Sequence, residues 1–121
     1  MIDHIGFDVS DYQRAKQFYS SALAPLGYSV MMEFGTVAGM GAEGIPDLWI
    51  SQGSATKPIM HIAFQCSKRA QVDKFYAAAL KAGGKDNGPP GIRKDYSPTY
   101  YAAYVFDPDG NNIEAVCHAP E

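Results

Sequence analysis

The sequence contains one pattern twice, and this duplication limits what the chain can fold into. Residues 58–84 align with residues 1–27 at a constant offset of 57 positions and without a gap. A chain of 121 residues is long enough to bury one core. We therefore expect a single domain over residues 1–121, with one module over about 1–57 and a second over about 58–121. The identical pairs are Ile2/Ile59, His4/His61, Ile5/Ile62, Phe7/Phe64, Ser10/Ser67, Phe18/Phe75, Tyr19/Tyr76, Ala22/Ala79, Leu23/Leu80 and Gly27/Gly84.

Composition excludes several classes of partner. The formal net charge is −3 and the basic residues are scattered, so neither nucleic acid nor a membrane surface is an expected partner. The first residues lack a basic segment followed by an apolar one, and no apolar run approaches the ~18 residues of a membrane span. Two cysteines, Cys66 and Cys117, fit no disulfide framework. We expect a soluble cytoplasmic protein with reduced, buried thiols.

Each half begins with a predicted strand and helix. In residues 2–9 apolar side chains alternate with polar residues or glycine, which predicts a strand with one buried face and places His4 on the other. Ser10, followed three positions later by glutamine, resembles a capping box. An amphipathic helix is therefore expected from near Asp11 to the Pro25–Gly27 segment.

The second half repeats this order, so that His61 also points away from its helix. The segment 107–112, DPDGNN, is typical of a hairpin turn, and Gly88–Lys94 is expected to be a loop near the mouth of a site. Short apolar segments predict further strands at 28–34, 36–40 and 47–51 in the first half, and the clearest ones of the second half are at 101–106 and 113–118.

A doubled βαβββ pattern, a histidine in the first strand of each half and the ending DPDGN-x-I-E resemble the vicinal oxygen chelate superfamily of glyoxalases, bleomycin-resistance proteins and extradiol dioxygenases. The resemblance covers essentially the whole chain. It implies an α+β fold whose two βαβββ modules pair into an incomplete barrel around a shared cavity and a divalent metal. The positions that match the family's metal ligands are His4, His61 and Glu114. The resemblance also implies a homodimer, with each site formed within one chain or across two.

One position departs from the glyoxalase pattern. Where glyoxalases usually have a fourth ligand, a glutamate, this chain has Trp49, with Asp47 two residues earlier on the same strand face. The implied set of two histidines and one carboxylate suits non-haem Fe(II) and also accepts Mn, Ni or Zn.

Several residues are candidates for a substrate pocket. Tyr100 and Tyr104 fall on one face of a predicted strand and Tyr101 on the other, so that one set is expected in the core and one in the cavity. Trp49 has the same two interpretations. Arg93 either binds a carboxylate or phosphate of a substrate or is solvated. The complete set is Asp47, Trp49, Arg93, Tyr100, Tyr101 and Tyr104.

Two functions follow from these interpretations. The first is a metal-dependent enzyme that acts on a small oxygenated organic molecule, by glyoxalase-like lyase or isomerase chemistry or by ring-cleaving dioxygenation. The alternative is a metal-independent protein that sequesters an aromatic compound, as bleomycin-resistance proteins do. The sequence assigns no residue to a catalytic step in either case.

Overall fold

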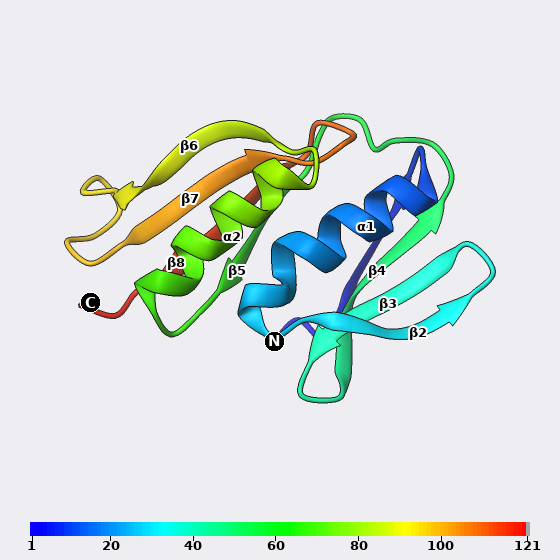
Figure 1. Ribbon diagram of the computed structural model, residues 1–121, viewed down its shortest axis with the longest axis horizontal. Coiled ribbons are helices and arrows are strands. Elements are labelled where there is room, and N and C mark those ends of the chain that lie inside the picture. The colour runs from blue at the N-terminus through cyan, green and yellow to red at the C-terminus, as the bar shows by residue number, and fades with distance from the viewer. Residues whose placement is uncertain (121) are drawn as a thin grey trace.

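The two halves of the chain form two modules with the same order of elements (Figure 1). The structure is a computed structural model that describes residues 1–120. The first module consists of β1 (Ile5–Val9), α1 (Tyr12–Leu23), the 3₁₀ turn η1 (Ala24–Leu26), β2 (Ser29–Phe34), β3 (Val37–Ala42) and β4 (Ile45–Gln52). The second consists of β5 (His61–Gln65), α2 (Arg69–Lys81), β6 (Lys85–Ile92), β7 (Tyr101–Phe106) and β8 (Asn112–Cys117).

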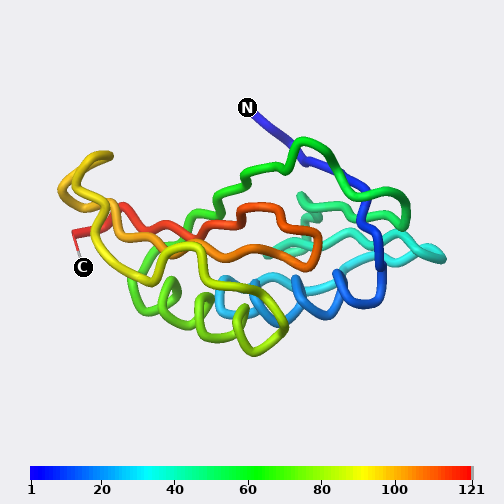
Figure 2. Tube along the Cα trace, turned by 90° about the horizontal axis from the view of Figure 1, so that it is seen from above, coloured from blue at the N-terminus to red at the C-terminus, as the bar shows by residue number. Residues whose placement is uncertain are grey.

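Each module contains one four-stranded mixed sheet. The strand orders are β1-β4-β3-β2 and β5-β8-β7-β6, and only the pairs β1/β4 and β5/β8 are parallel. Both helices lie on one side of the molecule and the sheets on the other (Figure 2). The predicted α+β architecture of two βαβββ modules is confirmed, and the two sheets do not close into a complete barrel. No helix within residues 1–120 has the length and apolar run needed to cross a membrane.

The core lies between the sheets and the helices. Alternation along β4 buries Leu48 and Ile50 against the helices, and alternation along β8 buries Ile113 and Ala115 in the same way. Phe18 of α1 is also fully buried. The period of two leaves the opposite face of each sheet free for other chemistry.

The turn at residues 107–112 joins the two modules. Asp107 is buried. Its carboxylate accepts hydrogen bonds from the amides of Asp109 and Asn111 and from the hydroxyl of Tyr19 in α1. The carboxylate of Asp109 accepts hydrogen bonds from the amide and hydroxyl of Ser10. The sequence motif DPDGN is therefore a structural connection between the halves.

The predicted capping box at Ser10 is wrong. The N-cap of α1 is Asp11, whose Oδ1 accepts from the amide of Arg14 at 3.1 Å. Ser10 instead donates hydrogen bonds to Asp109, which is 99 residues away in the sequence and therefore not revealed by the local sequence.

The prediction of a loop over Gly88–Lys94 is also wrong for most of its length. Residues up to Ile92 belong to β6, which pairs with β7 through two register shifts. Proline removes a ladder donor, so a strand with two prolines is tolerated only at an edge or a bulge. As the edge strand of its sheet, β6 satisfies that condition.

Substitution of Tyr19 by Phe tests the connection between the modules. Burial and the neighbouring Asp107 carboxylate raise the pKa of Tyr19 well above its ordinary value, so its hydroxyl remains a donor at neutral pH. Its loss leaves a buried carboxylate with one donor fewer and should lower the free energy of unfolding by about 1.5–3 kcal/mol in urea titrations. Tyr76→Phe, which removes an exposed hydrogen bond to Asp86, is the matched control. Equal midpoints for the two variants would contradict the assignment.

Candidate functional site

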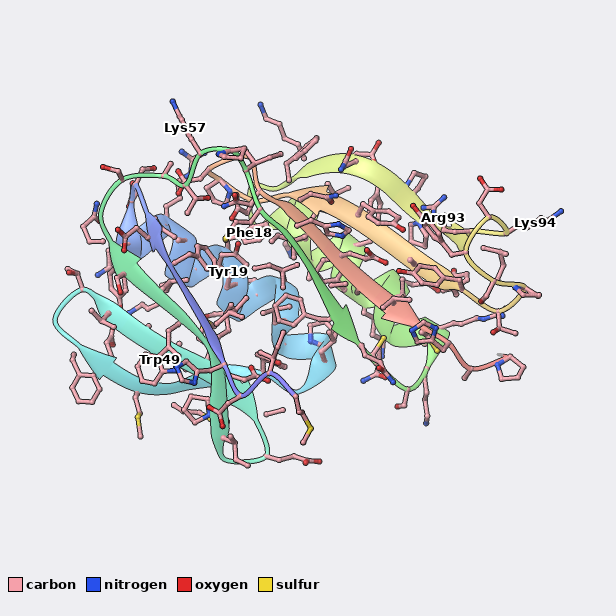
Figure 3. The ribbon with its side chains drawn as sticks, turned by 180° about the vertical axis from the view of Figure 1, so that it is seen from behind. Phe18, Tyr19, Trp49, Lys57, Arg93 and Lys94 are labelled. Carbon is pink, nitrogen blue, oxygen red and sulfur yellow. The ribbon has the colours of Figure 1, made fainter. Side chains whose placement is uncertain are left out.

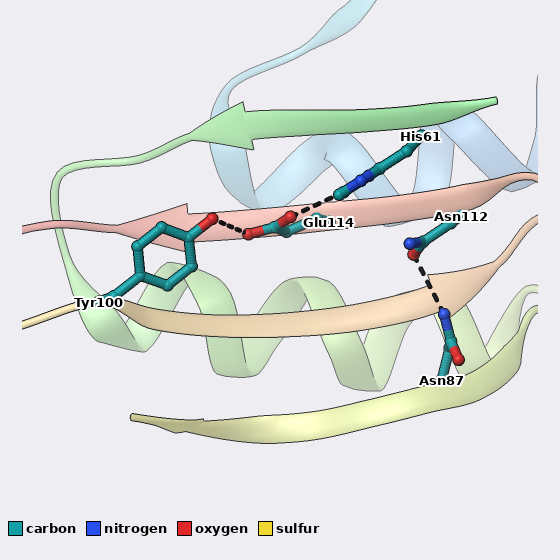
Figure 4. A network of polar contacts seen from close by, with 5 residues as sticks. All are labelled: His61, Asn87, Tyr100, Asn112 and Glu114. Atoms are coloured by element: carbon teal, nitrogen blue, oxygen red, sulfur yellow. Dashed lines mark hydrogen bonds and ion pairs between the residues drawn. The ribbon is translucent and has the colours of Figure 1, made fainter. Parts of the chain in front are cut away.

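The carboxylate of Glu114 is the centre of the free face of the second sheet (Figure 4). Glu114 is 1% exposed although it lies on the face opposite α2, where its register partners are Ala63 and Tyr104. Its Oε1 is 2.8 Å from Nε2 of His61, and its Oε2 accepts a hydrogen bond from the hydroxyl of Tyr100. A buried carboxylate is costly unless it is paired and hydrogen-bonded, and these two groups supply both.

Tyr100 is held in its neutral, donating form. Burial and the hydrogen bond to Glu114 raise the pKa of Tyr100 well above its ordinary value. Its backbone also fixes its place, because the amide of Arg93 donates to the carbonyl of Tyr100 at 2.8 Å and closes the loop between them. Tyr100 is thus a firm donor to one carboxylate oxygen, and His61 reaches the other.

An aromatic wall surrounds this pair. The ring centroid of Tyr104 is 6.3 Å from that of His61, and the ring of Tyr100 contacts the rings of Tyr96 and His118 at 5.0 and 5.2 Å. The sequence places Tyr100 and Tyr104 on one strand face, and the structure puts both beside Glu114.

Tyr101, a candidate residue of the substrate pocket, lies on the other side of the sheet. Its hydroxyl donates to Asp73 of α2 at 2.6 Å, and Arg69 of α2 lies over its ring. It therefore belongs to the helix-facing side of the sheet and does not line the face that carries Glu114.

His4 lies on the other module. It immediately precedes β1, its Nδ1 is 2.6 Å from Asp3, and its side chain is 57% exposed. A cavity of about 540 Å³ is lined by both His4 and His61 and by Asp47, whereas Glu114 is not part of its lining. Within residues 1–120, no three side chains of His, Cys, Asp or Glu come together closely enough to hold a metal ion. One chain thus brings together two of the three predicted ligands, His61 and Glu114.

The free face of the first sheet carries large apolar side chains beside a few polar groups. Trp49 lies across the sheet on the glycines of neighbouring strands: a Cβ on Gly39 would come within 2.6 Å of the indole ring. Met32, which pairs with Gly39 in register, and Phe34 are 46% and 64% exposed. Asp47, the other candidate here, accepts a hydrogen bond from Tyr28 at 2.8 Å. The exposed apolar side chains distinguish this face from that of the second sheet, where His61 and Glu114 lie.

Comparison with known proteins agrees with this duplicated architecture. Residues 1–115 match the family described as the Glyoxalase/Bleomycin resistance protein/Dioxygenase superfamily. The chain belongs to this superfamily. The resemblance found in the sequence is therefore confirmed over almost the full length.

Solved structures of this superfamily share the fold. A glyoxalase/bleomycin resistance protein from Albidiferax ferrireducens T118 is 26% identical, with 94% of this chain and 95% of that chain covered and a TM-score of 0.79. The fosfomycin resistance protein FosX from Mesorhizobium loti is 21% identical, with coverages of 94% and 88% and a TM-score of 0.71. FosX from Listeria monocytogenes is 19% identical, with coverages of 96% and 88% and a TM-score of 0.72. No curated protein matches the sequence.

Sequence reasoning missed the bond between Tyr100 and Glu114 and the hydrogen bond of 3.2 Å from Asn87 to Asn112 beside them (Figure 4). Parity along β7 and β8 places Tyr104 and Glu114 on one face, but the reach of Tyr100 depends on the closed loop before β7. Asn87 was missed because β6 was not predicted as a strand.

Substitution of Tyr100 by Phe should destabilise the protein. It removes a donor from a carboxylate that is almost fully buried, and we expect a loss of about 1.5–3 kcal/mol in the free energy of unfolding, measured by urea denaturation. Tyr96→Phe is the control, because Tyr96 is 68% exposed and contacts the same ring. The role assigned to Tyr100 is contradicted if the two variants unfold at the same urea concentration.

Proposed function

We propose that this protein is a metal-dependent enzyme that acts on a small oxygenated organic molecule. The observation that carries the proposal is the pair of His61 and Glu114, which lie 2.8 Å apart on the free face of a sheet, in the strands where the superfamily pattern predicts ligands. His61 is half exposed, so the pair can be reached from outside.

The residues present fit a divalent cation. An imidazole and an anionic carboxylate are donors suited to Fe(II), Mn(II), Ni(II) or Zn(II), and a cation would compensate the buried negative charge of Glu114. Tyr100 holds the second carboxylate oxygen, which leaves Oε1 directed toward His61. When bound, the metal would polarise a substrate oxygen and stabilise negative charge that develops there.

We propose further that a second copy of the chain supplies His4 as the third ligand. Two observations support this arrangement: His61 and Glu114 meet without His4 in one chain, and the free face of the first sheet leaves Met32 and Phe34 exposed. Exposed apolar faces of this kind are typical of interfaces. In a symmetric homodimer the first sheet of each copy would face the second sheet of the other, and a shared site would form twice.

Metal content tests the ligand set. After dialysis and reconstitution with Mn(II), Fe(II), Ni(II) or Zn(II), elemental analysis should find about one metal ion per chain. His4→Ala, His61→Ala and Glu114→Gln should each lose most of this metal, because the two remaining ligands rarely compensate for the loss of the third. Mn(II) is a suitable first choice, since the Listeria FosX structure contains it. His118→Ala, which removes a histidine near Tyr100 but outside the set, is the control. Retention of metal by all three variants would contradict the proposal.

A mixture of two variants tests whether the site is shared. If His4 and His61 act across chains, a co-refolded equal mixture of His4→Ala and His61→Ala chains contains mixed dimers with one intact site each. The mixture should then recover about a quarter of the wild-type metal content, from random pairing of two chains. Recovery near zero, although the mixed dimers form, would place the site within one chain.

A second function is favoured by the free face of the first sheet. Trp49 is half-buried on that face, with Met32 and Phe34 exposed on the same sheet, which would suit the sequestration of an aromatic compound without chemistry. Fluorescence of Trp49 distinguishes this function: quenching by aromatic ligands that is equal with and without EDTA, in a protein that retains no metal, would favour it over the enzyme.

A further inference from the structure

Arg93 carries a charge that no carboxylate neutralises. Its Nη2 donates to the carbonyl oxygens of Pro89 and Ala102, the latter at 3.3 Å. Its Nε is buried without an acceptor, and within residues 1–120 Arg93 forms no ion pair. A guanidinium that is half-buried, bonded only to carbonyls and left with free donors is suited to bind an anion.

The irregular edge strand β6 holds this guanidinium in place. Arg93 lies over the ring of Tyr104, with Cζ 5.2 Å from the ring centroid. Gly88 permits this stacking in two ways: its φ of +147° is in a region that side chains avoid, and a Cβ there would lie 2.9 Å from the Tyr104 ring and 3.3 Å from Nη2 of Arg93. The segment GPPGIR therefore forms a cradle for one side chain.

The cradle opens into a hollow beside the metal-ligand pair. A cavity of about 590 Å³ is lined by Arg93, Lys94, Asp95, Tyr96, Tyr104 and Asn87, among others. Two cationic side chains and one carboxylate thus line the hollow, and among the described residues the exposed Asp95 forms no ion pair with Arg93. Figure 3 shows Arg93 over the second sheet and Lys94 extending away from it.

Two connections link this hollow to Glu114. Tyr104 contacts Arg93 on one hand and the ring of His61 on the other. The hydrogen bond from the Arg93 amide to the Tyr100 carbonyl fixes Arg93 against the residue that holds Glu114. A molecule with one end at His61 and Glu114 would present its other end to Arg93 across the Tyr104 ring.

We infer that Arg93, in the cradle formed by β6 over Tyr104, is the binding site for an oxyanion of the substrate, and that the substrate is a small organic acid with a carboxylate or phosphonate group. This inference rests on the proposed function for the other end of the molecule, at His61 and Glu114. Binding of the anion itself depends on Arg93 and not on a metal.

The test measures binding to metal-free protein, so that it is independent of the metal site. Benzoate and phenylphosphonate are the two anionic probes, and benzamide is a neutral molecule of nearly the same shape as benzoate. Calorimetry gives the affinities, and amide and Arg Nε chemical shifts in NMR locate the site. Arg93→Met removes the charge, and Arg93→Lys retains it without the planar fork.

Two matched controls are available in the chain. Arg69 also lies over a tyrosine ring, that of Tyr101 at 5.1 Å, and also has a buried Nε without an acceptor, but it belongs to the helix-facing side. Arg69→Met therefore removes an equivalent charge elsewhere. Lys94→Met removes the exposed neighbouring charge in the hollow.

We expect at least one anionic probe to shift the resonances of Gly88, Gly91 and Arg93, and to bind about tenfold or more weakly to Arg93→Met, while Arg69→Met changes the affinity less than about twofold. Benzamide should bind about tenfold more weakly than benzoate. A preference for one of the two anions identifies the acid.

The inference is overturned if no probe perturbs these residues, if benzamide binds as well as benzoate, or if Arg93→Met, or Arg93→Lys where the Met variant does not fold, binds every probe like the wild type. Anion binding in a protein that never retains metal would overturn the proposed metalloenzyme and leave the oxyanion site intact.

Discussion

The burial of the Glu114 carboxylate is the constraint on which the rest of the site depends. A charged group that is 1% exposed requires compensation, and His61 and Tyr100 each approach one of its two oxygens. The loop before β7 positions the Tyr100 donor, and the backbone hydrogen bond from the Arg93 amide to the Tyr100 carbonyl closes that loop. The same closure sets the Arg93 guanidinium over Tyr104. The buried carboxylate thus connects the pair of His61 and Glu114 with the adjoining cationic hollow.

Duplication has produced two sheets with the same topology and different free faces. The first offers Trp49 lying over Gly39, with exposed Met32 and Phe34, and the second offers His61 and Glu114 within a wall of tyrosines. In the proposed homodimer these two faces would meet and combine apolar rings with a few polar groups, which is the usual composition of a small-molecule site. The helices pack on the same side of the molecule, so both faces remain available to a second copy (Figure 2).

The sequence alone predicted the features that follow a regular period. Alternation along the strands located β7 with its bounds, and the internal repeat placed His4 and His61 on equivalent faces. Features that depend on distant partners could not be predicted in this way. Ser10 resembled a helix cap because its true partner, Asp109, lies at the other end of the chain. The strand β6 resembled a loop because its prolines and glycines carry no alternation, and its pairing depends on bulges against β7.

Anomalous X-ray diffraction at the Mn edge, from crystals of the Mn(II)-reconstituted protein, tests the central claim most directly. The account predicts one anomalous peak for each chain, adjacent to Nε2 of His61 and Oε1 of Glu114, with His4 of a second copy as the third protein ligand. A peak at any other place, or a metal bound by His4 and His61 of one chain without Glu114, would contradict it.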